Sequence, residues 1–186
     1  MLMSNEIDNR EYPFWVVIEN HEIERKFTIF LRVTKILNGG KNMTEASKTY
    51  FRILEENIEN IPFTYREKIY YPCAVNCVKE GVLQEEKKHF EECNGDIDLI
   101  YEKYARTDYY FRNVIEKGHI YELGYPRCLC YLVDEGICKT SGHCECSRQS
   151  IIYILHELMP FKNIKVETIE TVLGGAEQCR FGIEIE

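Results

Sequence analysis

Hydrophobic residues in the first half of the chain recur at the three- and four-residue spacing of amphipathic helices. The spacing predicts helices over residues 15–38, 44–60, 63–81, 82–93 and 96–104. Residues that stop helices fall between several of these segments, at Asn38-Gly39-Gly40, Ile61-Pro62 and Asn94-Gly95. We therefore expect residues 1–107 to be helical.

The pattern changes after residue 108, where aromatic and β-branched residues bounded by glycine predict strands. We expect strands at 109–111 and 118–123, a hairpin over 129–139, a helix after Ser147, and a strand pair at 164–173 and 179–185. In the last strand, four residues alternate with mostly polar ones and should face inward: Cys179, Phe181, Ile183 and Ile185. Residues 108–186 should thus form a mostly antiparallel sheet crossed by one helix.

Together the two halves predict an α+β fold, and the length of 186 residues predicts a single domain, 1–186. The net charge of −8 and the lack of a basic stripe argue against a nucleic-acid-binding surface. The sequence contains no apolar run near the ~20 residues of a membrane span. The polar, acidic N-terminus is unlike a signal peptide. We therefore expect a cytoplasmic protein that does not associate with membranes.

Nine cysteines are the most distinctive feature of the composition. Thiols stay reduced in the cytoplasm, which favours metal binding, a reactive thiol or plain burial over disulfides. Two Cys-x-Cys pairs, Cys128/Cys130 and Cys144/Cys146, bracket a Gly-containing turn. If each pair lies on a strand, its sulfurs share one face, and the two pairs supply the four ligands of a structural zinc site. An iron–sulfur cluster is the alternative for the same ligands.

Catalysis is a second hypothesis for Cys146. This residue directly precedes the predicted helix, and the positive end of a helix dipole lowers the pKa of a nearby thiol. His143 lies three residues earlier and is the candidate base that would activate Cys146 as a nucleophile.

The chain is rich in aromatic residues, with thirteen Tyr and nine Phe. Such residues usually pack in cores, and they also line pockets for small hydrophobic or aromatic molecules. The tyrosines nearest the cysteine-rich segment are the candidate pocket residues: Tyr101, Tyr104, Tyr109, Tyr121 and Tyr125.

Residues 118–186 contain three motifs in a recognisable order. They are Tyr125-Pro126-Arg127-Cys128-Leu129-Cys130, then Cys144-Glu145-Cys146-Ser147 with its helix, then Gly175-Ala176-Glu177-Gln178-Cys179-Arg180-Phe181. This part of the chain resembles 4-vinyl-reductase-type small-molecule-binding domains and L-2-amino-thiazoline-4-carboxylic acid hydrolase-like proteins. It departs from them at Ala176, where an acidic residue is usual, and in its Cys-x-Cys spacing.

The resemblance implies a fold, a homodimer and a preference for small ligands. In the vinyl-reductase-type domains, a zinc held mainly by Cys lies beside a buried pocket for small aromatic molecules. The leading hypothesis is thus a small-molecule-binding or sensory domain stabilised by zinc at the two Cys-x-Cys pairs. The alternative, implied by the hydrolase-like proteins, is hydrolysis of a small cyclic C–N or C–S compound by Cys146 or by metal-activated water.

Overall fold

The computed structural model describes residues 43–186. The chain divides after Thr44, and every helix and strand described below belongs to the unit Glu45–Glu186. The helix predicted over residues 15–38 lies outside the described residues. The single-domain organisation of 1–186 stays a prediction.

Four helices open the described part of the chain, as the hydrophobic spacing predicts. They are α2 (Glu45–Glu59), α3 (Phe63–Val78), α4 (Val82–Glu92) and α5 (Ile97–Lys103). Pro62 is the N-cap residue of α3, and its fixed φ of −52° suits the start of a helix. The side chain of Asp96 caps α5 by accepting the backbone N–H groups of Asp98 (2.9 Å) and Leu99 (3.2 Å).

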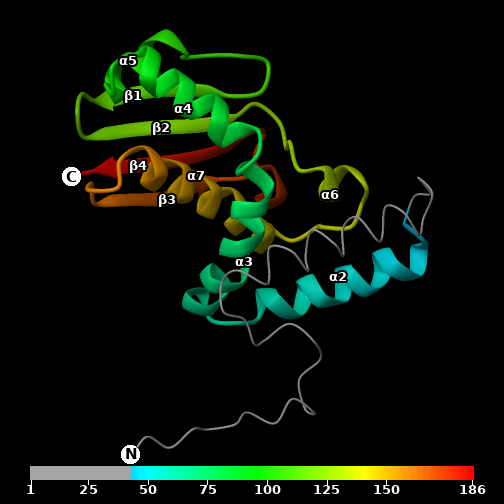
Figure 1. Ribbon diagram of the computed structural model, residues 1–186. Helices are drawn as coiled ribbons and strands as arrows, with labels where there is room; N and C mark the ends of the chain where they lie inside the picture. The colour runs from blue at the N-terminus through cyan, green and yellow to red at the C-terminus, as the bar shows by residue number, and fades with distance from the viewer. Residues whose placement is uncertain (1–42) are drawn as a thin grey trace, which may run out of the picture. The chain divides into compact units, whose positions relative to one another are not determined.

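The C-terminal half contains a four-stranded antiparallel sheet in the order β1-β2-β4-β3 (Figure 1). Its strands are β1 (Phe111–Glu116), β2 (Ile120–Tyr125), β3 (Ile164–Glu170) and β4 (Cys179–Ile185). Each lies at or next to a predicted range. A short 3-10 helix, η2 (Val172–Gly174), connects β3 to β4.

The core lies between one face of the sheet and the helices α5 and α7 (Glu145–Leu158) (Figure 1). Ile100 and Tyr101 of α5 and Ile151 and Leu155 of α7 pack in one cluster with the buried side chains of the sheet. The four residues of β4 predicted to face inward are all buried. The fold is therefore α+β, with helices in the first half and the sheet at the C-terminus, as predicted.

The predicted hairpin over residues 129–139 is wrong. The segment instead forms a single helical turn, α6 (Tyr131–Asp134), followed by the 3-10 helix η1 (Ser141–Cys144). The carbonyl of Cys130 accepts the N–H groups of Val133 and Asp134, which closes that turn. The Cys-x-Cys pairs consequently do not lie on strands, and α7 begins at Glu145 rather than after Ser147. Among the described helices, none combines the length and apolar character needed to cross a bilayer.

Candidate functional site

The cysteine-rich segment meets helix α2 at Glu55. This is the buried residue of α2, with 5% of its surface exposed. Its Oε2 accepts the backbone N–H of Lys139 at 2.9 Å. The thiol of Cys138 donates a hydrogen bond to the same carboxylate, and burial together with this bond raises the pKa of Cys138. Two adjacent residues of the segment thus fix the carboxylate in place.

His143 of η1 connects this carboxylate to a second thiol. Its Nδ1 lies 3.1 Å from Oε1 of Glu55, and its Nε2 lies 3.3 Å from Sγ of Cys130. The ring of Tyr70 packs edge-on against the imidazole, with 5.7 Å between the ring centroids. The thiol, imidazole and carboxylate therefore form a continuous row, which is the arrangement of a nucleophile, its base and the group that orients the base.

The electrostatics of the row keep the resting thiol and the resting imidazole neutral, so His143 would accept the proton only as the sulfur of Cys130 attacks. Burial lowers the pKa of His143 against the opposing charge of Glu55, so the imidazole is neutral at pH 7. Burial raises the pKa of Cys130, while hydrogen bonds from the backbone N–H groups of Leu132 and Val133 favour its thiolate. Cys130 is half-buried, so a small molecule can reach it, whereas the side chain of His143 is 11% exposed.

The same carboxylate belongs to a compact group of metal-ligand types. One ligand atom each from Glu55, Cys138 and His143 lies within 4.8 Å of the other two. Oε1 of Glu55 is buried and lacks a well-formed hydrogen bond, because the 3.1 Å contact with His143 is poorly aligned. A carboxylate, a thiolate and an imidazole are all zinc ligands, and three protein ligands leave one position open. The group fits a zinc ion chemically.

The four sulfurs predicted to bind zinc lie in one region but are not part of that group. Burial raises the pKa of Cys144 to about 11, and the nearby Cys128 and Cys130 contribute to the rise. The Cys144 thiol also bonds to Thr171. Cys130 is adjacent to the group through His143, whereas Cys146 contacts a different thiol.

The nucleophile predicted at Cys146 has a different environment from the one expected. Its hydrogen-bond partner is the thiol of Cys77 on α3, and this bond and burial raise its pKa rather than lower it. The thiol that contacts His143 is Cys130. His143 therefore lies beside Cys130 rather than beside Cys146. From the sequence, Cys130 was predicted only as a metal ligand.

Sequence reasoning missed Glu55. An acidic residue within Glu55-Glu56 on a polar helix looks like any solvated side chain, and nothing local marks it for burial. Its partners Lys139 and His143 lie more than eighty residues further along the chain, so no sequence signal could have found it.

The five tyrosines predicted to line a pocket pack mainly with neighbouring side chains. Tyr101 and Tyr121 contact each other in the core, with 4.9 Å between ring centroids, and the Tyr121 hydroxyl donates to Asp98 at 2.8 Å. Tyr104 stacks on His89 and Tyr125 packs against Phe181. Tyr109 is exposed. None of the five lines either cleft described next.

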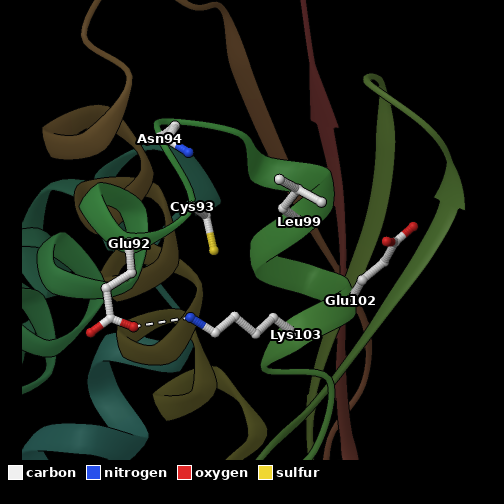
Figure 2. A pocket seen from close by; sticks show the side chains of 6 residues that line it. All are labelled: Glu92, Cys93, Asn94, Leu99, Glu102 and Lys103. Atoms are coloured by element: carbon white, nitrogen blue, oxygen red, sulfur yellow. Dashed lines mark hydrogen bonds and ion pairs between the residues drawn. The ribbon is translucent and has the colours of Figure 1, made fainter.

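The clefts on the described surface include one at the α4–α5 junction and one beside η1. The larger, about 390 Å³, lies where α4 ends and α5 begins (Figure 2). Its charged groups are already paired, Glu92 with Lys103 at 3.1 Å and Glu102 with Lys117 at 2.8 Å. The smaller, about 210 Å³, is lined by residues of α3, η1, α7 and the β3–β4 connection: Phe63, Arg66, Ser141, Gly142, Cys144, Glu145, Thr168 and Thr171. Two of these, Gly142 and Cys144, immediately flank His143 in the sequence.

Comparison with known proteins found no matching family model, curated protein or solved structure. The resemblance of residues 118–186 to the two protein groups named above therefore stays a prediction. The geometry of the site carries the functional argument.

Proposed function

We propose that this protein is a thiol-dependent hydrolase of a small cyclic C–N or C–S compound. Cys130 is the nucleophile, His143 is the general base, and Glu55 orients the imidazole. The observation that carries the proposal is the 3.3 Å contact between Sγ of Cys130 and Nε2 of His143, with Glu55 on the other ring nitrogen.

In the first half of the reaction, Nε2 of His143 accepts the thiol proton as the sulfur of Cys130 bonds to the electrophilic carbon. The ring C–N or C–S bond breaks, and the leaving atom takes the proton from the imidazolium. In the second half, neutral His143 accepts a proton from water as the oxygen attacks the same carbon. The bond to Cys130 then breaks, and the thiolate regains its proton from His143.

The smaller cleft borders η1, which carries His143, but is lined by neither His143 nor Cys130; it is the proposed site for the part of the substrate away from the reacting carbon. Its volume of about 210 Å³ is below the usual range for drug-sized ligands, so it suits a small compound. Nε of Arg66, which lines the cleft, is buried without a hydrogen-bond partner. A carboxylate on the substrate would satisfy this donor. We place the reaction in the cytoplasm, because all nine cysteines are free thiols.

Turnover with a substrate panel tests the proposal. Thiazoline, lactam and thiolactone compounds, each with and without a carboxylate, are incubated with the full chain, and ring opening is followed by mass spectrometry. We expect turnover of at least one ring class, a transient adduct on Cys130, and complete loss of both in Cys130→Ala. Cys128→Ala is the matched control, because it removes a half-buried thiol two residues away and should retain activity. Turnover that survives in Cys130→Ala would overturn the assignment.

A zinc-dependent hydrolase is the second candidate, favoured by the buried, poorly bonded Oε1 of Glu55. Glu55, Cys138 and His143 would hold the ion, and a zinc ion with an open position lowers the pKa of its bound water. Stoichiometric zinc that is lost in Cys138→Ser and kept in Cys130→Ser would favour this candidate over the thiol mechanism.

The zinc-stabilised, homodimeric binding domain inferred from the sequence makes a different prediction. Its zinc would be lost in Cys128→Ser and Cys144→Ser and unaffected in Cys138→Ser. Elemental analysis of these single variants therefore separates the two possible ligand sets.

A further inference from the structure

A second pair of thiols lies where helices α3 and α7 pack together. Cys73 and Cys77 are four residues apart on α3, and the thiol of Cys77 is hydrogen-bonded to that of Cys146 on α7. The two helices also meet through the rings of Tyr71 and Tyr153, whose centroids are 6.3 Å apart. The pair joins two helices that the rest of the structure already holds side by side.

The two thiols differ in exposure. Cys77 is exposed and Cys146 is half-buried, so a reagent in solution meets Cys77 first. The pair thus combines an accessible thiol with a less exposed thiol in contact with it, which is the arrangement of an attacking and a resolving cysteine.

We propose that Cys77 and Cys146 form a peroxide-sensitive disulfide that links α3 to α7. The sulfur of Cys77 attacks a hydroperoxide, the S–O bond forms, the O–O bond breaks, and the departing oxygen leaves as water or an alcohol after taking a proton. Cys77 is then a sulfenic acid. The sulfur of Cys146 attacks it, the S–S bond forms, the S–O bond breaks, and the hydroxide leaves as water with the Cys146 proton. The peroxide accepts the two electrons that the two thiols lose.

Neither thiol contacts His143 or Glu55 in the described hydrogen bonds, but Cys77 and Cys146 are both close enough to Cys130 to interact with it electrostatically. The disulfide would constrain the unfolded chain between positions 77 and 146 and thereby stabilise the folded protein. The oxidised form is therefore expected to unfold at a higher urea concentration than the reduced form.

Peroxide treatment followed by peptide mapping tests the proposal. The reduced full chain is exposed to hydrogen peroxide at pH 7, free thiols are blocked with N-ethylmaleimide, and linked peptides are identified by mass spectrometry. We expect a peptide that joins Cys77 to Cys146, together with a raised urea midpoint. The linked peptide should be absent in Cys77→Ser and Cys146→Ser.

Cys73→Ser is the matched control, because Cys73 lies on the same helix one turn earlier and is also exposed. It should give the same linked peptide as the wild type, and so should Cys130→Ser, which removes the proposed nucleophile. Two results would overturn the proposal: irreversible oxidation of Cys77 with Cys146 still free, or a dominant disulfide between any other two cysteines.

Discussion

Replacing Glu55 with glutamine should prevent His143 from acting as a base toward Cys130 without unfolding the protein. In the wild type, Oε1 of Glu55 lies 3.1 Å from Nδ1 of His143, so the carboxylate favours the tautomer with the proton on Nδ1, whose Nε2 lone pair faces Cys130. In Glu55→Gln the oxygen can still accept the Lys139 N–H, while the new amide N–H₂ faces Nδ1. An amide donor favours the tautomer with the proton on Nε2, and that tautomer cannot accept the thiol proton.

The magnitude follows from the role of the base. General bases contribute about 10²–10⁴-fold, and an analogous Asp-to-Asn change in a Ser-His-Asp triad costs about 10⁴-fold. We expect alkylation of Cys130 by iodoacetamide at pH 7 to slow by about 10²-fold or more in Glu55→Gln. The difference should narrow at high pH, where the thiol ionises without a base. Stability should change little, whereas Glu55→Ala leaves the Lys139 N–H unpaired and should cost about 1–3 kcal/mol.

The assay is the pH profile of Cys130 alkylation, read on the Cys130 peptide, beside urea unfolding of each variant. Equal alkylation rates for wild type and Glu55→Gln across the pH range would refute the reasoning, because a purely structural carboxylate would leave the profile unmoved.

Three further predictions concern stability. Asp96→Ala removes the N-cap of α5 and should lower the free energy of unfolding by about 1 kcal/mol in urea titrations. Asp108→Ala is the control, because it removes an aspartate that does not cap α5. Gly124 on β2 lies opposite Phe111 on β1, and a Cβ at position 124 would lie 2.1 Å from the Phe111 ring. Gly124→Ala should therefore lower the free energy of unfolding by about 1–3 kcal/mol in the same titrations. An unchanged free energy would show that the Phe111 ring moves aside without cost. Burial lowers the pKa of His143 below its ordinary value of 6.5, so the unfolded state binds more protons than the folded state at mildly acidic pH. The free energy of unfolding should therefore fall as the pH drops below 6.5 and through the pKa of the folded state. His143→Gln should remove this part of the pH dependence.

Much of the fold follows from local sequence patterns. The alternation of Cys179, Phe181, Ile183 and Ile185 with mostly polar residues predicts which face of β4 is buried, because strand side chains alternate strictly. Pro62 and Asp96 place helix boundaries for equally local reasons. The segment 129–139 does not follow such a pattern, since its run of apolar residues from Leu129 to Val133 suits a short strand or a helical turn equally well. Contacts with α2 hold that segment in place, including Lys48 with Glu135 and Glu55 with Lys139.

In the candidate site, too, some features follow from local sequence and others depend on contacts between distant residues. His143 is recognisable from sequence as a possible base, because it lies among cysteines. Its pairing with Cys130 depends on the turn at α6 and on the 3-10 helix η1, and neither is encoded by a periodic pattern. Glu55 is the third member of the row, although it lies more than eighty residues before His143 in the sequence. The packing of α2 against η1 brings the two residues together.

The most direct test of the account is the alkylation rate of Cys130 in wild type and in His143→Ala at pH 7, measured peptide by peptide in one reaction. Cys77 is the internal reference, because its low pKa comes from Cys146 and not from His143. The account predicts that the rate at Cys130 falls by at least about tenfold in His143→Ala while the rate at Cys77 is unchanged. An unchanged rate at Cys130 would contradict the assignment of His143 as its base.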